Sequence, residues 1–191
     1  MSKDYNVLMA GFGGQGILFA GKVIAYAALL ENKELSWLPS YGPEMRGGTA
    51  NCSICISDEP IGSPLVVSPN VFIAMNLPSF DKFVGAVQSE GTVVIDSFLI
   101  NKKVERSDIT TFYIPATKLA EENNIKGLAN MIMLGKMFKE TAFCREESLY
   151  KGLERCVPKK KSELLEQNKA AISLGIKYTL YKVKGRINIK K

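Results

Sequence analysis

Short apolar segments alternate with longer ones along this chain. Residues 5–10 (Y-N-V-L-M-A) are short and mostly apolar, as in a strand buried within a parallel sheet, whereas residues 17–30 have the length of a helix that packs on such a sheet. Later segments repeat the alternation, with strands expected at 34–38, 49–56, 71–75, 91–96 and 111–114. Helices are expected at 78–87, at 128–139 and after Ser162, which is expected to be the N-cap of the last helix. The pattern predicts an α/β fold in which helices cover both faces of a mostly parallel sheet.

A glycine-rich turn joins the first strand to the first helix. Residues 11–16 read G-F-G-G-Q-G, which is the G-x-G-x-x-G pattern in its strand–turn–helix context. In that pattern Gly11 allows the tight turn, Gly13 lets a ligand approach the backbone, and Gly16 allows the helix to pack closely on the strand. Free backbone N–H groups and the helix dipole at this end favour an anion such as a phosphate. A tight turn that binds no ligand is the alternative.

The second requirement of a dinucleotide site is not met. An acidic residue is expected about 20 residues further on, at the end of the next strand. The strand at 34–38 ends instead in P-S-Y-G-P, and Glu34 stands at its other end. A P-loop is also excluded, because the spacing G-x-x-x-x-G-K over residues 16–22 is followed by Val23 rather than Ser or Thr. Nicotinamide chemistry and NTP hydrolysis are therefore disfavoured.

The segment 39–48 (P-S-Y-G-P-E-M-R-G-G) is a shaped loop, since its prolines and glycines prevent a helix. Ligands of parallel sheets bind outside the carboxyl ends of the strands. That edge is expected to collect the glycine turn, this loop, the residue after the strand at 71–75, and Ser97. The candidate ligand-binding residues are Gly11, Gly13, Gly14, Gln15, Gly16, Ser40, Tyr41, Glu44, Arg46, Gly47 and Asn76.

Several kinds of chemistry are excluded by composition. The chain contains no histidine, so it has no histidine general base, no Ser-His-Asp triad and none of the histidine-based metal sites. Cys52 and Cys55 form C-x-x-C, but in a strand positions three apart point to opposite faces, and Cys144 and Cys156 are isolated. We expect buried, inert thiols and no metal site. The N-terminus lacks a signal-peptide pattern and no apolar run reaches the length of a membrane span, so a cytoplasmic protein is expected.

The positive charge is concentrated near the C-terminus. Residues 157–191 hold ten Lys or Arg and two Glu, a net charge of +8, whereas the whole chain carries +6, so residues 1–156 carry −2. We divide the chain into one domain at 1–181 and a basic tail at 182–191. The tail is either solvated or a contact for an acidic partner. No nucleic-acid-binding pattern accompanies it, so no nucleic-acid partner is expected.

Four ordered motifs give the chain a family resemblance: G-F-G-G-Q-G-I-L-F-A-G-K-V-I at 11–24, W-L-P-S-Y-G-P-E-M-R-G-G-T-A-N-C-S at 37–53, S-D-E-P-I-G-S-P at 57–64 and A-N-M-I-M-L-G at 129–135. Over roughly residues 5–180 the sequence resembles the gamma subunit of 2-oxoacid:ferredoxin oxidoreductases, of the 2-oxoglutarate or branched-chain type. The resemblance implies a Rossmann-like three-layer domain within a multi-subunit enzyme. Such an enzyme oxidatively decarboxylates a 2-oxoacid, forms its acyl-coenzyme A and reduces ferredoxin.

The resemblance also implies how cofactors and partners are distributed. Thiamine diphosphate lies between the alpha and beta subunits and the iron–sulfur clusters lie on partner chains, so this chain alone holds no cofactor and no catalytic residue. Its partners are the alpha and beta subunits and ferredoxin, while a delta subunit is left open. An isolated gamma chain is expected to be able to self-associate through its vacant docking face.

The role of the ligand edge has more than one reading. In the first, this edge forms part of the coenzyme A path and Arg46 pairs with a phosphate. In the second, the 39–48 loop is purely a docking surface and Arg46 pairs with a carboxylate of a neighbouring subunit. Glu44 is a local alternative partner for Arg46. A purely structural subunit is a further possibility. The alternative from another class is a free-standing Rossmann-type nucleotide-binding protein or reductase.

Overall fold

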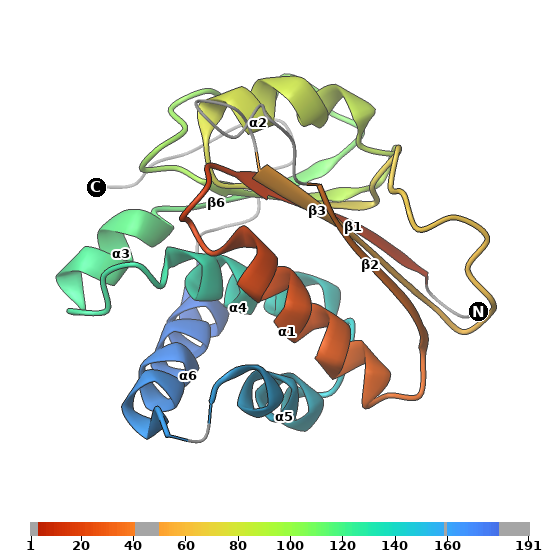
Figure 1. Ribbon diagram of the computed structural model, residues 1–191. Coiled ribbons are helices and arrows are strands. Elements are labelled where there is room, and N and C mark those ends of the chain that lie inside the picture. The colour runs from red at the N-terminus through yellow and green to blue at the C-terminus, as the bar shows by residue number, and fades with distance from the viewer. Residues whose placement is uncertain (1–3, 41–49, 159, 180–191) are drawn as a thin grey trace.

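A single six-stranded sheet forms the centre of the molecule in the computed structural model, which describes residues 4–40, 50–158 and 160–179 (Figure 1). The strand order is β2-β3-β1-β4-β5-β6. Their bounds are β1 Tyr5–Gly11, β2 Glu34–Ser40, β3 Ala50–Ser57, β4 Val71–Ala74, β5 Thr92–Asp96 and β6 Thr110–Ile114. Each lies within about two residues of a strand expected from the sequence.

The sheet is parallel except at β3. The pairs β1–β4, β4–β5 and β5–β6 are parallel, whereas β3 is antiparallel to both β1 and β2. The predicted mostly parallel sheet is confirmed. The sequence did not predict that β3 would run between β1 and β2. Because β2 and β3 follow one another without an intervening helix, β3 returns antiparallel beside β2.

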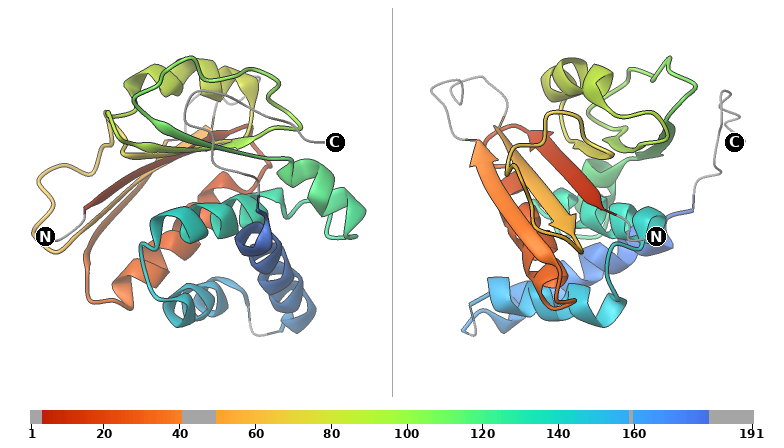
Figure 2. Two further views of the ribbon diagram at one scale, coloured as in Figure 1. Left: turned by 180° about the vertical axis from the view of Figure 1, so that it is seen from behind. Right: turned by 90° about the vertical axis from the view of Figure 1, so that its right-hand side faces the viewer.

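Helices cover both faces of the sheet and give three layers (Figure 2). On one face lie α1 (Ile17–Leu29), α4 (Ala129–Thr141), α5 (Glu146–Cys156) and α6 (Ser162–Lys177), while α2 (Leu77–Phe83) and the 3-10 turn η2 (Val84–Ala86) lie on the other. Helix α3 (Ala116–Glu122) follows β6. The sequence analysis missed α3 and α5, and it placed Ser162 before the last helix, whereas Ser162 is the first helical residue and the preceding Lys161 makes no side-chain cap.

Strand β1 is buried on both faces, which explains its unbroken apolar sequence. Val7 and Met9 belong to the hydrophobic cluster under α1 and α4, and Leu8 and Ala10 belong to the cluster on the α2 side. Three methionines of α4, which we expected to be core residues, are fully buried in the first cluster: Met131, Met133 and Met137. The core therefore consists of two apolar layers separated by the sheet.

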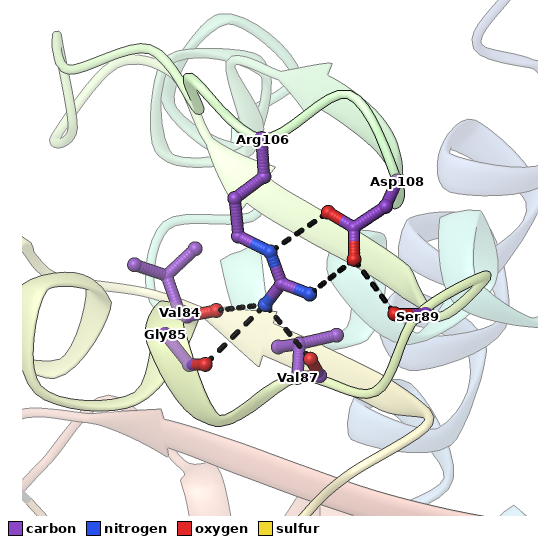
Figure 3. Close-up of polar contacts among 6 residues, drawn as sticks. All are labelled: Val84, Gly85, Val87, Ser89, Arg106 and Asp108. Carbon is purple, nitrogen blue, oxygen red and sulfur yellow. Dashed lines mark hydrogen bonds and ion pairs between the residues drawn. The ribbon is translucent and has the colours of Figure 1, made fainter.

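Arg106 fastens the connection between β5 and β6 to the end of the α2–η2 segment (Figure 3). Its Nε and Nη2 donate to the two carboxylate oxygens of Asp108 at 2.9 and 2.6 Å. Its Nη1 donates to the carbonyl oxygens of Val84, Gly85 and Val87 at 3.2, 3.3 and 2.8 Å. A guanidinium is suited to this position because its fixed fork of donors engages a carboxylate and backbone carbonyls together.

Replacing Arg106 with Ala should lower the melting temperature by about 2–4 °C, because the carbonyls at the end of η2 lose their donor. Arg106→Lys should lower it nearly as much, since an ammonium cannot span both groups. The exposed pair of Lys102 and Asp81 supplies the control, and Lys102→Ala should shift the value by less than about 1 °C. Thermal unfolding followed by circular dichroism measures all three variants.

The same contact has a defined pH dependence. Hydrogen bonds from Arg106 and Ser89 hold the pKa of the Asp108 carboxyl well below its usual range. A lowered pKa in the folded state stabilises the protein above the unfolded-state value, about 4, and that contribution is lost progressively as the pH falls below it. The difference between wild type and Arg106→Ala should therefore shrink below about pH 4. A difference that grew on acidification would contradict this account.

Candidate functional site

The carboxyl ends of four strands meet at one edge of the sheet. In the strand register Ala10 lies opposite both Ala74 and Asn51, and Asn51 in turn lies opposite Ser40. Gly11, Ser40, Asn76 and Ser97 therefore share one edge, as the sequence indicated. Tyr41, Glu44, Arg46 and Gly47 lie outside the described residues, as does the basic tail at 182–191.

The backbone of the glycine turn favours glycine at two of its positions. Gly14 and Gly16 have φ values of 88° and 73°, in the left-handed region. Gly16 immediately precedes α1, which begins at Ile17 with neither a side-chain cap nor an acidic residue in its first turn. The first N–H groups of a helix have no acceptor within that helix, so this end of α1 presents unneutralised donors at the edge of the sheet.

Gln15 holds the turn closed against β4. Its Oε1 accepts a hydrogen bond from the Phe12 N–H at 2.6 Å, and its Nε2 donates to the Met75 carbonyl at 3.0 Å. Both ends of the amide are thus engaged within the chain. Gln15 braces the glycine turn, and the Phe12 N–H is not among the donors open to a ligand.

Asn76 caps α2 from the end of β4. Its Oδ1 accepts from the Ser79 N–H at 2.8 Å, which is the usual function of an asparagine at this position. Its Nδ2 is buried and has no hydrogen-bond partner among the described residues, and the same holds for the Ser79 hydroxyl. Asn76 is therefore a structural cap that retains one unused donor.

Asn130 is a residue of the site that the sequence analysis did not single out. It lies in the first turn of α4, and its Nδ2 donates to the Gly16 carbonyl at 3.0 Å. A Cβ atom on Gly16 would lie 2.4 Å from that nitrogen, so this position requires glycine both for its φ and for the close approach. Asn130 stands out in the sequence as the polar residue of the motif A-N-M-I-M-L-G. Its contact with Gly16 could not be predicted, because the two residues lie 114 positions apart in the sequence.

Asp96 ends β5 and is also structural. Its Oδ1 accepts from the Phe98 N–H at 3.1 Å, and its Oδ2 accepts from the N–H and hydroxyl of Thr117 at 3.1 and 2.6 Å. Burial raises the pKa of this carboxyl, although the hydrogen bonds from Thr117 and Phe98 oppose the shift. With both oxygens occupied, Asp96 fixes the start of α3 and the turn after β5.

Exposed apolar side chains border this edge. Phe12 follows β1, Leu77 follows β4, and Phe98 and Leu99 follow β5, and all four are more than a third exposed (42, 37, 51 and 40 %). We call these four residues the apolar rim. Large apolar groups gathered at one edge are typical of a binding or docking surface.

Cys52 and Cys55 lie where the strand period predicts and are buried, whereas Cys144 and Cys156 are only partly buried, which corrects the expectation for these two. Cys52 packs under α1, whereas Cys55 belongs to the cluster on the opposite face, so the prediction that they diverge is confirmed. Burial raises the pKa of Cys52 and of Cys144 to about 12 and that of Cys156 to about 11, and it also raises the pKa of Cys55. Among the described residues no group of cysteine and acidic side chains could hold a metal ion.

No helix in the described part of the chain is both long enough and apolar enough to cross a membrane.

Replacing Gly16 with Ala should lower the free energy of unfolding by about 2–4 kcal/mol, because the new methyl group meets Asn130 and the residue keeps a left-handed φ. In an Asn130→Ala background the cost should fall to about 1–2 kcal/mol, since only the φ strain remains. Gly62, which has no atom within 4 Å of an added Cβ, supplies the control. Urea unfolding of the full chain measures the values, and equal costs in the two backgrounds would contradict the proposed contact.

Comparison with known proteins gives consistent matches over most of the chain. The family profile described as pyruvate ferredoxin/flavodoxin oxidoreductase matches residues 6–178. The chain is 37% identical to the 2-oxoglutarate synthase subunit KorC of Methanocaldococcus jannaschii, over 89% of this chain and 91% of that protein. It is 34% identical to the ketoisovalerate oxidoreductase subunit VorA of Methanothermobacter marburgensis over 96% of this chain, but spans only 38% of the length of that relative.

Solved structures agree with these sequence matches. The gamma subunit of a keto/oxoacid ferredoxin oxidoreductase from Geobacter sulfurreducens superposes with a TM-score of 0.78 at 27% identity, covering 90% of this chain and 96% of that one. The 2-oxoglutarate:ferredoxin oxidoreductase from Magnetococcus marinus, solved with 2-oxoglutarate, coenzyme A and succinyl-CoA bound, gives a TM-score of 0.82 at 25% identity. That match covers 92% of this chain and 31% of the other.

Proposed function

This chain belongs to the pyruvate ferredoxin/flavodoxin oxidoreductase family, and we propose that it is the gamma subunit of a multi-subunit 2-oxoacid:ferredoxin oxidoreductase. The match to KorC, which covers 89% of this chain and 91% of that protein, carries the proposal, because KorC is a named subunit of a 2-oxoglutarate synthase. In the reaction the bond between the 2-oxo carbon and the carboxylate breaks, carbon dioxide leaves, and the acyl group is transferred to the coenzyme A thiol. The electron pair released reduces ferredoxin.

The substrate is 2-oxoglutarate or a branched-chain 2-oxoacid. Relatives of both kinds support this range, since KorC is named for 2-oxoglutarate and VorA for ketoisovalerate. The side chains that choose between the two acids belong to partner chains, which also hold the thiamine diphosphate and the iron–sulfur clusters. We assign this subunit to the cytoplasm.

We assign no acid, base or nucleophile to this chain. It contains no histidine, burial raises the pKa of all four thiols, and the Asp96 carboxylate is already occupied by its hydrogen bonds. Its contribution is assembly of the complex and part of the coenzyme A path. The unneutralised start of α1 beside the apolar rim supports the second role, since coenzyme A combines phosphates with an apolar arm.

The partners are alpha and beta subunits, with ferredoxin as electron acceptor and a delta subunit left open. VorA supports direct contact with another domain, because its matching region is part of a much longer chain. We assign this contact to the apolar rim. None of the relatives described above supports the alternative of a free-standing nucleotide-binding protein or reductase, and β2 ends in Pro39 and Ser40 rather than in an acidic residue.

Anaerobic purification of the tagged chain from its native cells should bring down larger chains in a fixed ratio, together with iron and thiamine diphosphate. The complex should reduce ferredoxin only when a 2-oxoacid and coenzyme A are both present. Comparing initial rates with 2-oxoglutarate, ketoisovalerate and pyruvate identifies the substrate, and omission of coenzyme A is the control. A chain that is recovered alone with a bound nicotinamide or flavin would refute the proposal.

The variant Phe98→Asp should abolish recovery of the partner chains, because a carboxylate placed on the apolar rim disfavours burial in an interface. Val67 is more exposed still, at 71%, but lies in the connection between β3 and β4, so Val67→Asp is the matched control and should assemble normally. Both chains should melt within about 2 °C of wild type, since both sites are exposed. Normal assembly of Phe98→Asp would exclude the rim as the interface.

A further inference from the structure

A shallow groove lies between the end of α1 and the last turns of α5. Its volume is about 530 Å³, and the residues that line it are Leu30, Lys151, Glu154, Arg155, Val157 and Pro158. Leu30, Val157 and Pro158 make part of its wall apolar, and Leu29 beside it is 47% exposed. Since α1 has 13 residues, the groove lies roughly 20 Å from the glycine turn and is separate from the ligand edge.

One charged side chain of the groove has no partner. Lys151 pairs with Glu147 at 2.7 Å. Glu154 pairs with Lys169 at 3.0 Å, so its charge is neutralised as well. Arg155, in the last turn of α5, is exposed and makes no ion pair with any residue that the structure describes. The free charge of the groove is therefore positive.

Two more unpaired cations follow in the turn that leads to α6. Lys160 and Lys161 are exposed, and within the described ranges neither makes an ion pair. The Lys161 N–H donates to the Pro158 carbonyl at 2.8 Å, so this turn borders the groove. Lys161 also directly precedes α6, where the helix dipole disfavours a cation and where Ser, Asn or Asp is the usual cap. Glu163 in the first turn supplies one negative charge against these two positive ones. The placement of the lysines becomes favourable once an acidic group lies against them.

The character of the groove indicates a protein partner rather than a nucleic acid or a membrane surface. Nucleic-acid affinity grows with the number of phosphates that are neutralised, and anionic membranes are bound by clusters of about four to eight Lys or Arg. Here three free cations stand beside apolar walls. A protein segment that carries carboxylates next to apolar side chains complements both features.

We propose that this groove docks an acidic segment of a partner subunit. Carboxylates of that segment pair with Arg155, Lys160 and Lys161. Its apolar side chains contact Leu30 and Pro158. The inference rests on the proposed function, which places this chain in a multi-subunit enzyme. Because the apolar rim begins just before α1 and the groove lies at the end of α1, the partner chains hold the subunit at both ends of this helix.

The variant Lys161→Glu tests the groove in the complex purified with its partner chains. A carboxylate before α6 favours the helix dipole but repels an acidic segment. The partner chains should leave the immobilised variant at about half the salt concentration that releases them from wild type. The melting temperature of the full chain should stay equal or rise, which excludes a folding defect. Lys103→Glu reverses an exposed cation between β5 and β6, and this matched control should release its partners as wild type does.

A carbodiimide, which joins an amine directly to a carboxylate, identifies the occupant of the groove. It should link Lys160 or Lys161 to an Asp or Glu of a partner chain, and reversing that carboxylate to Lys should restore the salt resistance of Lys161→Glu. Release of wild type and Lys161→Glu at the same salt concentration would overturn the proposal. A link to a second copy of this chain would overturn it too, as would wild-type binding to RNA or to phosphatidylserine vesicles that Lys161→Glu abolishes. A complex that shows the salt difference but reduces ferredoxin with no 2-oxoacid would support the groove and refute the proposed function.

Discussion

The hydrogen bond from Asn130 to the Gly16 carbonyl is the constraint on which the candidate site depends. It joins two residues 114 positions apart and fixes the start of α4 against the turn that follows β1. Only a glycine allows this approach, because a side chain at position 16 would occupy the space of the Asn130 amide. Since Gln15 ties the same turn to the Met75 carbonyl at the end of β4, the two bonds together place the start of α4 at the edge where ligands of such sheets bind.

The fold could be predicted from local pattern wherever burial leaves a periodic signature. Strand β1 and helices α1 and α4 are apolar on the faces they bury, so their sequences reveal them. Helix α5 is amphipathic but reads E-E-S-L-Y-K-G-L-E-R-C, in which polar residues outnumber the buried Leu149 and Leu153, and it was missed. The antiparallel direction of β3 follows from its connection to β2 without a helix, whereas its place between β1 and β2 is a long-range choice with no local signature.

In the candidate site, too, features that depend on local neighbours could be predicted and features that depend on distant contacts could not. The place of the glycine turn between β1 and α1 and the place of Asn76 after β4 followed from the sequence, because both depend on neighbours within a few residues. The bond from Gln15 to Met75, the bond from Asn130 to Gly16 and the clamp of Arg106 on η2 did not, since each joins segments that are distant in the sequence. Residue type indicated which side chains were suited to bind, and only the fold identified which of them are already engaged.

The shielding of the four thiols has a consequence for the redox chemistry of this subunit, since Cys52 and Cys55 are buried and Cys144 and Cys156 are partly buried. Thiol–disulfide exchange requires a thiolate that can reach the incoming sulfur, and burial keeps the pKa of all four cysteines above its ordinary value. A small disulfide therefore meets thiols that are shielded from it and that are disfavoured as thiolates. Under mild oxidising conditions disulfide adducts should therefore form slowly on this subunit, and first at the partly buried Cys144 and Cys156.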